Sequence, residues 1–183
     1  MDDIYTQCPE IEGDDYLLRL VQQQDAADLI SCYGNSESIP FLNEDNFTYA
    51  FGRVDLTVSE MENTIQMWLD AYNERGFVRF AIVEKASDRV IGTIEMFNWS
   101  SVSEGLGLLR LDVNHEHETA AALSELLGLS DSFFALFDCG NILTKGFEKS
   151  QPRVDALKAN GYEPFSQLQQ KEFSREGYWA KKK

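Results

Sequence analysis

The composition indicates a folded, acidic chain. Its 183 residues are enough for one well-buried core and few for two, so we expect a single domain over residues 1–183. Hydrophobic residues make up 43% and aromatic residues 12%, which argues against a disordered protein. The formal net charge of −15 opposes binding to nucleic acid or to an anionic membrane and attracts cationic ligands.

The sequence shows no signal for export and no cysteine spacing typical of disulfides or zinc sites. The N-terminus, MDDIY, has neither the basic start nor the apolar stretch of a signal peptide, and no apolar run is long enough to cross a membrane. Cys8, Cys32 and Cys139 are odd in number and widely separated, which predicts neither a disulfide framework nor a zinc knuckle. We therefore expect a cytoplasmic protein with reduced thiols.

The first half of the chain predicts a strand and two helices. The alternation of bulky and polar residues from Tyr16 to Val21 indicates a strand, and Asp25 is placed to cap a helix that runs to Tyr33. Residues 35–56 show no clear period. The capping box Thr57-Val58-Ser59-Glu60 then starts a helix with an apolar stripe, which ends near Gly76.

The second half predicts a hairpin, further strands and two helices. The hairpin joins residues 77–84 and 90–97, and a third strand runs from Gly105 to Val113. A helix over residues 119–137, which Gly128 or Ser130 breaks or kinks, precedes a strand over residues 141–147. Pro152 opens the last helix and Gly161 closes it. A final strand lies within residues 172–182, with one more possible near Phe165. This order indicates an α/β sandwich.

Two segments carry a family resemblance. "FAIVEKASDRVIGTIEMFN" in the middle of the chain and "QPRVDALKANGYEPF" near its end, taken with the order of elements, resemble the GNAT superfamily of N-acetyltransferases. The pattern is most similar to the branch that modifies ribosomal-protein N-termini. The resemblance implies a mixed, mostly antiparallel central sheet with helices on both faces, the acyl-CoA N-acyltransferase fold. It also implies that two strands, the one that ends at Val113 and the one that begins near Asn141, splay apart at their C-terminal ends and form a cofactor cleft.

The resemblance further implies acetyl-CoA as cofactor, bound where the strand ending at Val113 meets the next helix. Backbone groups of the strand would contact the pantetheine arm, N–H groups of the helix start would hold the pyrophosphate, and a residue before the last helix would touch the pantetheine arm. The strand positions are Leu111 and Val113, the positions at the helix start are Thr119, Ala120 and Ala121, and the position before the last helix is Ser150.

This sequence departs from the family pattern at the same junction. The family's pyrophosphate loop is Gln/Arg-x-x-Gly-x-Gly/Ala, but Glu116 stands here for the Gln or Arg and Thr119 for the first Gly. A carboxylate beside a pyrophosphate adds repulsion, and a side chain in place of Gly adds steric cost. Where relatives have a Tyr or Ser that protonates the leaving thiolate, this chain has Leu157 and Arg153.

Glu95 and Asp112 are the candidate catalytic residues. Both lie on strands that we expect to flank the cleft, where a carboxylate can take a proton from an ammonium before the amine attacks the thioester. The alternative is that both are ordinary solvent-facing acids in a chain that has 31 acidic residues.

His115 and His117 are candidate metal ligands. If the segment is extended, both lie on one side of it, near Glu116 and Glu118, and could hold a divalent metal or form a pH-sensitive surface. Because no third ligand from elsewhere is evident, we predict no metal site.

Two functions remain open from the sequence. The first is transfer of acetyl from acetyl-CoA to a primary amine, on a small molecule or peptide and cationic in view of the protein's charge, by direct attack in a ternary complex. The second is a non-catalytic binding module that keeps the fold and has lost acetyl-CoA binding. Neither nucleic acid nor membrane is an expected partner. A homodimer is possible if some of Phe133, Phe134 and Phe137 are exposed.

Overall fold

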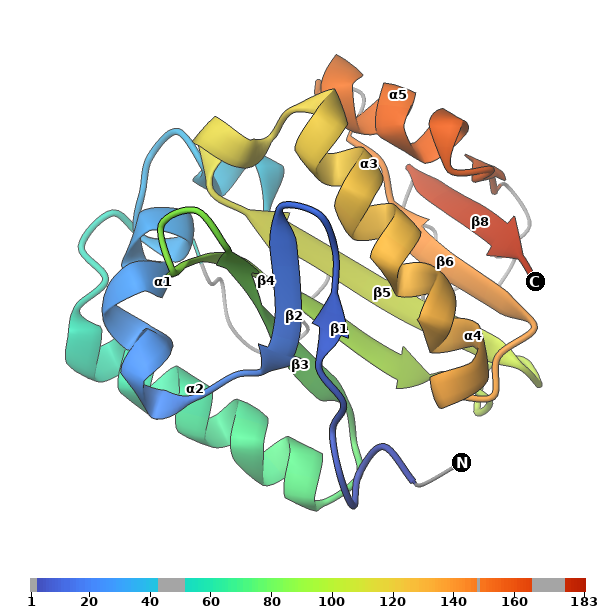
Figure 1. Ribbon diagram of the computed structural model, residues 1–183, viewed down its shortest axis with the longest axis horizontal. Helices are drawn as coiled ribbons and strands as arrows, with labels where there is room; N and C mark the ends of the chain where they lie inside the picture. Colours follow the sequence, from blue (N-terminus) through green and yellow to red (C-terminus); the bar gives the residue numbers. More distant parts are fainter. Residues whose placement is uncertain (1–2, 43–51, 148, 166–176) are drawn as a thin grey trace.

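A computed structural model describes residues 3–42, 52–147, 149–165 and 177–183. These residues form one eight-stranded sheet in the order β1-β2-β3-β4-β5-β6-β8-β7 (Figure 1). Only β5 and β6 pair in parallel among these strands, which confirms a mixed, mostly antiparallel sheet. The strands are β1 Ile11–Glu12, β2 Tyr16–Leu20, β3 Val78–Glu84, β4 Arg89–Asn98, β5 Leu106–Val113, β6 Asn141–Lys145, β7 Glu163–Pro164 and β8 Tyr178–Lys182.

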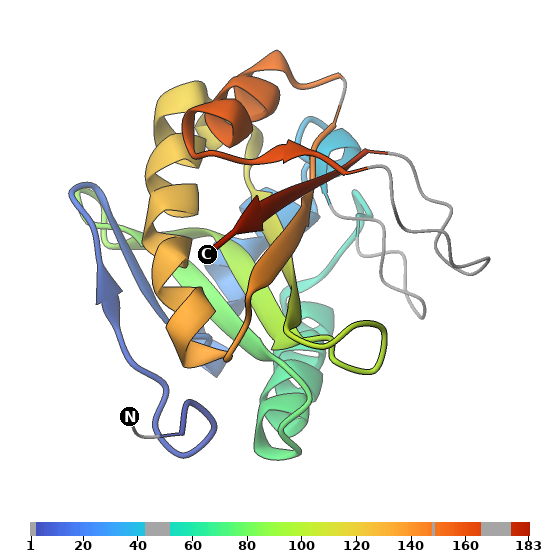
Figure 2. The same cartoon turned by 90° about the vertical axis from the view of Figure 1, so that its right-hand side faces the viewer.

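Helices cover both faces of the sheet (Figures 1 and 2). One face carries α1 Ala26–Tyr33 and α2 Val58–Asn73; the other carries α3 Ala120–Leu129, α4 Phe133–Leu136 and α5 Gln151–Ala159. Short 3-10 segments occur at η1 Gln23–Asp25, η2 Ile39–Phe41, η3 His115–His117 and η4 Ser130–Ser132. This two-sided covering is the predicted α/β arrangement.

Local sequence signals account for the helix ends. The Thr57 side chain accepts from Glu60 N–H and the Glu60 side chain accepts from Thr57 N–H, so the predicted capping box starts α2. The predicted break after Gly128 is the short segment η4, where Ser130 Oγ donates to Leu127 O at 2.6 Å. At the end of α5, Gly161 has φ of 77°, a conformation that favours glycine.

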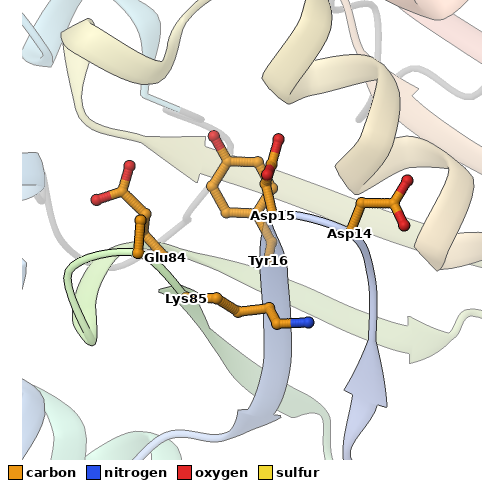
Figure 3. A pocket seen from close by; sticks show the side chains of 6 residues that line it. Asp14, Asp15, Tyr16, Glu84 and Lys85 are labelled. Carbon is orange, nitrogen blue, oxygen red and sulfur yellow. The ribbon is translucent and has the colours of Figure 1, made fainter.

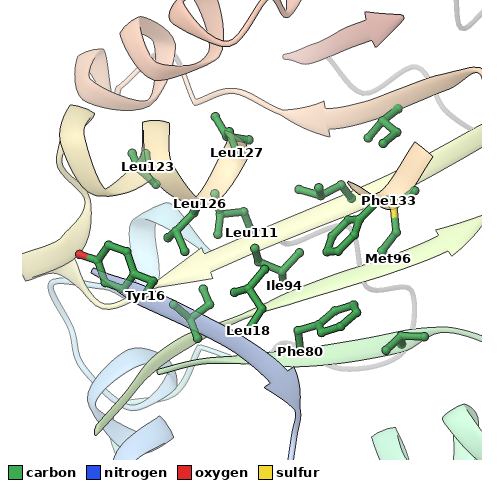
Figure 4. Close-up of a cluster of buried hydrophobic side chains, with 14 of the residues drawn as sticks. Tyr16, Leu18, Phe80, Ile94, Met96, Leu111, Leu123, Leu126, Leu127 and Phe133 are labelled. Atoms are coloured by element: carbon green, nitrogen blue, oxygen red, sulfur yellow. The ribbon is translucent and has the colours of Figure 1, made fainter. Parts of the chain in front are cut away.

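The main core lies between the sheet and the α3, α4 and α5 layer (Figure 4). Alternate residues of β5, namely Leu109, Leu111 and Val113, point into it, as the strand period predicts. A second apolar cluster under α1 and α2 includes Met61, Ile65 and Trp68. The sheet is therefore buried on both faces.

Gly92 permits the close contact between β4 and β5. It pairs with Val113, and a Cβ built on Gly92 would lie 2.1 Å from Asp112 O. No side chain fits at that distance, so close packing of the two strands explains why Gly follows Ile91. The position lies opposite Val113, at the end of β5 next to the candidate site.

Several expectations need correction. Asp25 precedes α1, but its carboxylate accepts from Gln22 N–H and Arg19 and makes no capping bond to α1. Strand β1 was not predicted, because two residues are too few to give a period. The final strand covers Tyr178–Lys182, and residues 172–176 of the predicted region lie outside the described residues.

The phenylalanines proposed as a possible dimer surface are buried. Phe133, Phe134 and Phe137 are at most 6% exposed and pack in the main core. They therefore give no support to a dimer. Within the described part of the chain, no helix has the length and apolar character that crossing a membrane requires.

Candidate functional site

The two parallel strands at the centre of the sheet part at their C-terminal ends. Residues Leu106 to Leu109 of β5 pair with Asn141 to Thr144 of β6, and the pairing stops there. Residues 110–113 of β5 continue to pair with β4 alone, while Lys145 of β6 pairs with Tyr178 of β8. The predicted divergence is confirmed, because β5 and β6 no longer pair beyond Leu109 and Thr144 (Figure 1).

The junction after β5 is closed by its own side chains. Asn114 Oδ1 accepts from His117 N–H at 3.3 Å, which caps η3, and Thr119 Oγ1 accepts from Ala122 N–H at 3.3 Å, which caps α3. Thr119, Ala120 and Ala121 form the exposed start of α3, as expected for a strand-to-helix junction.

Between η3 and α3, the chain turns Glu118 inward. Its carboxylate receives Arg153 Nε at 2.8 Å on one oxygen and Arg153 Nη2 at 2.6 Å on the other. Ser150 Oγ donates to the same carboxylate at 2.7 Å. All three side chains are nearly inaccessible, at 9% for Glu118 and 2% for both Arg153 and Ser150.

The same guanidinium reaches the free end of β5. Arg153 Nη1 donates to Leu111 O at 2.8 Å, and the guanidinium carbon lies 4.9 Å from the centre of the Phe147 ring. We call Glu118, Ser150, Arg153 and the Leu111 carbonyl the Arg153 cluster. It joins β5, the junction and α5 across the divergence of the strands.

Acetyl-CoA does not fit the residues in this arrangement. The predicted site needs the backbone of Leu111 for the pantetheine arm, but the Leu111 carbonyl already accepts from Arg153. Ser150, also predicted to contact the cofactor, is turned toward Glu118. A buried carboxylate beside the helix start opposes a pyrophosphate there. Two of the predicted positions, Leu111 and Ser150, are thus connected through the Arg153 guanidinium and the Glu118 carboxylate.

A pocket of about 510 Å³ lies elsewhere, where the turn before β2 meets the end of β3 (Figure 3). It is lined by Asp14, Asp15, Tyr16, Glu84, Lys85 and Ala86. Burial, with smaller contributions from nearby carboxylates, raises the pKa of Tyr16 to about 12, so this phenol stays protonated. None of the predicted cofactor residues lines this pocket.

The opposite face of the sheet carries a ladder of buried charges. Arg79, Glu95 and Arg110 are direct partners on β3, β4 and β5, and Glu95 accepts from Arg79 with one oxygen and from Arg110 with the other. The Arg79 guanidinium also lies 4.2 Å from the Trp68 ring centre. Glu95 is 1% exposed, so the alternative that it faces solvent is wrong.

Asp112, the second candidate catalytic residue, belongs to the same face. Its Oδ2 accepts from Tyr33 Oη at 3.1 Å and lies 3.9 Å from Arg79 Nη1. Burial and then the Asp112 charge raise the pKa of Tyr33 well above its ordinary value, which keeps Tyr33 a donor. At 4% exposure Asp112 is not a solvent-facing acid either. The structure therefore brings Glu95 and Asp112 together through Arg79, and their catalytic role stays a prediction.

The two histidines point to different partners. The segment is a 3-10 turn rather than extended chain, and at roughly three residues per turn positions two apart do not share a side. His115 Nε2 lies 3.2 Å from Glu37, whereas His117 Nε2 lies 3.0 Å from Glu84. The expectation that they share a side is wrong, and no group of metal-binding side chains occurs among the residues described.

Comparison with solved structures shows the fold. A ribosomal-protein-S5-alanine acetyltransferase from Vibrio fischeri is similar with a TM-score of 0.71 and 14% identity, over 95% of this chain and 96% of that one. A GNAT-family acetyltransferase from Bacillus anthracis gives 0.69 and 14%, over 95% and 98%. AAC(6')-Ib, solved with ribostamycin and coenzyme A, gives 0.67 and 13%, over 92% and 94%. The sequence matches no protein-family model and no curated protein.

These similarities confirm the resemblance at the level of the fold. The Arg153–Glu118 pair is a feature of the site that the sequence did not predict. A signal was present, because the helical period that buries Ala156 and Leu157 also places Ser150 and Arg153 on the inner face of α5. A buried arginine needs an acidic partner.

Proposed function

We propose that this chain, which has the GNAT acetyltransferase fold, is an N-acetyltransferase that moves acetyl from acetyl-CoA to a primary amine. One observation carries the proposal: the fold extends over nearly the whole chain and includes the divergence of β5 and β6. In the proposed reaction the amine nitrogen bonds to the acetyl carbon, the carbon–sulfur bond breaks, and the sulfur leaves with CoA. A base takes the proton that the amine gives up.

The proposed contacts follow the geometry of the junction. Once the space between β5 and α5 is open, backbone groups of Leu111 and Val113 would face the pantetheine arm and Ser150 would lie beside it. The exposed start of α3, at Thr119, Ala120 and Ala121, offers the N–H groups and positive dipole end that favour phosphate.

Asp112 and Glu95 are the proposed proton acceptors on the other face of the sheet. Asp112 is the preferred acceptor because its Oδ2 accepts from the neutral Tyr33 phenol, whereas each oxygen of Glu95 accepts from a guanidinium. The net charge of −15 supports a cationic acceptor, such as a polyamine, an aminoglycoside or a basic peptide N-terminus.

A second candidate function is favoured by the Arg153 cluster. A chain whose cofactor space is permanently filled by Arg153 would be a non-catalytic binding module. The two candidates differ in one respect, which is whether the filled arrangement can open.

An acetyl-transfer assay tests the proposal. Purified protein, millimolar acetyl-CoA and a panel of cationic, neutral and acidic amines are monitored for release of CoA thiol, with mass spectrometry of the acetylated product. Amine-dependent thiol release with a preference for cationic amines is expected. Release that favours acidic or phosphorylated amines contradicts the proposed acceptor class. Absence of release with every amine, from the parent and from a variant opened at Arg153, contradicts the enzyme.

A further inference from the structure

The hydrogen-bonding groups of the Arg153 cluster pair with one another inside the protein. Each of the three guanidinium nitrogens of Arg153 has an acceptor: Nε and Nη2 on the two oxygens of Glu118, and Nη1 on Leu111 O. Two parallel N–H···O bonds to one carboxylate are the strongest arrangement available to an arginine. Three of the five N–H groups of this guanidinium are therefore engaged within the cluster.

The cluster also lies at the point where the two central strands, β5 and β6, diverge. Its members come from three segments that are far apart in sequence: the end of β5, the junction before α3, and the first turn of α5. The cluster joins these segments on the part of β5 where the pairing with β6 has ended. A side chain that served stability alone could lie anywhere in the core, but this one spans the opening between the strands.

We infer that the Arg153 cluster is an autoinhibitory contact, which holds the space between β5 and α5 closed and which must open before acetyl-CoA can enter. The inference rests on the proposed function and specifies how that site is regulated. Opening requires Arg153 to leave Leu111 O and requires Glu118 to turn away from the helix start. The apparent affinity for acetyl-CoA is then the affinity of the open form multiplied by the fraction of molecules that are open.

The decisive variant removes the contact without leaving a buried charge. Arg153→Ala alone would leave Glu118 ionised and unpaired beside the start of α3, which opposes phosphate as well as folding. Glu118→Gln combined with Arg153→Ala removes both charges, keeps an acceptor for Ser150 Oγ and empties the volume of the guanidinium. Glu118→Gln alone is a milder second variant, in which the pair is weakened and the volume is kept.

The chain offers a matched control. Arg19 donates to both oxygens of Asp25, at 2.9 and 2.7 Å, and Asp25 is 2% exposed. This is the same bidentate chemistry at the edge of α1, away from the diverging strands. Arg19→Ala combined with Asp25→Asn therefore removes a comparable ion pair without touching the proposed contact.

Isothermal titration with acetyl-CoA compares the parent, the two cluster variants and the control, after near-UV circular dichroism has established that each is folded. We expect the double cluster variant to bind at least tenfold more tightly than the parent, Glu118→Gln to lie between them, and the control to match the parent. Equal dissociation constants for parent and both cluster variants, or no detectable binding by any of them, would overturn the inference. If the double variant does not fold, the comparison of parent with Glu118→Gln decides in the same way.

The outcome also separates this inference from the proposed function. A variant that gains binding but transfers no acetyl group supports the autoinhibitory contact and contradicts the enzyme. A parent that transfers acetyl and binds acetyl-CoA as tightly as the variants supports the enzyme and contradicts the contact.

Discussion

Arg153 and Glu118 face each other through two parallel hydrogen bonds of 2.8 and 2.6 Å, at the point where the pairing of β5 with β6 ends. A buried pair of this kind is costly to break from one side, because the partner that remains is an unpaired charge in a region of low dielectric. The pair therefore controls both the stability of the junction and access to it.

Arg153→Ala should destabilise the protein by about 3–5 kcal/mol, the usual cost of removing one partner of a buried ion pair. Glu118→Gln combined with Arg153→Ala should cost less than Arg153→Ala alone, because no charge is left unpaired. Urea unfolding at pH 7 of the parent, both single variants and the double variant gives the coupling energy directly. Additive effects of the two substitutions would show that the residues do not interact as described.

Glu116 is exposed, unlike Glu118, and its effect on phosphate should be purely electrostatic. In the background of Glu118→Gln and Arg153→Ala, we expect Glu116→Arg to tighten acetyl-CoA binding by about tenfold, or about 1.4 kcal/mol. The gain should shrink as salt rises, since exposed charges are screened over about 8–10 Å. Titrations at low and high ionic strength measure it. A gain that does not depend on salt would mean that Glu116 acts through something other than its charge.

Glu95 holds the charge ladder together, and Glu95→Ala should cost about 3–5 kcal/mol because Arg79 loses its carboxylate at a site with 3% exposure. Glu95→Gln should cost less, since one amide oxygen can still accept. Thermal unfolding of both variants checks the order. If Glu95→Ala were as stable as the parent, the ladder would not be a structural element of the sheet.

Asp112→Asn tests the proposed base. The amide keeps the shape and an acceptor for Tyr33, so we expect a small change in stability and a loss of about 100-fold in the turnover number for the amine. The KM for acetyl-CoA should stay unchanged. Tyr33→Phe is the control, because it removes the hydroxyl donor and leaves the carboxylate. Parental turnover in Asp112→Asn would exclude Asp112 as the proton acceptor.

Glu60 should make the stability of α2 depend on pH. Hydrogen bonds from Thr57, followed by one from Arg53, lower the pKa of Glu60 from an ordinary 4.5 to about 2. Because the folded value is the lower one, the stabilisation is fully present above pH 4.5 and is lost as the pH falls toward about 2. The difference in free energy of unfolding between the parent and Glu60→Ala should thus be constant above pH 4.5 and shrink below it. A difference that does not change down to pH 2.5 would contradict the capping role.

Much of the fold could be predicted from sequence because local signals agree with the sheet. The Thr57 capping box, the alternation of Leu109, Leu111 and Val113, and Gly161 at the end of α5 each specify one local structure, and the structure has all three. The Asp25 capping prediction failed because a closer competitor, Arg19, takes the carboxylate.

The site was harder to predict, because its decisive contact joins residues 35 positions apart in the chain. Periodicity can place Arg153 on the inner face of α5, but it cannot say that Glu118 will turn inward while Glu116 stays in solvent. That choice depends on where η3 ends and α3 begins, and hence on the caps supplied by Asn114 and Thr119. The buried positions of Glu95 and Asp112 likewise depend on strand register, which the sequence pattern does not fix.

The central claim is that this fold still transfers acetyl once the Arg153 cluster is open. The most direct measurement is the initial rate of amine-dependent CoA release by the Glu118→Gln, Arg153→Ala variant, at fixed acetyl-CoA and with a polyamine as acceptor, beside the parent under the same conditions. The account predicts a measurable rate for the variant, at least tenfold above that of the parent when acetyl-CoA is subsaturating. A folded variant that binds acetyl-CoA and releases no CoA with any cationic amine would contradict it.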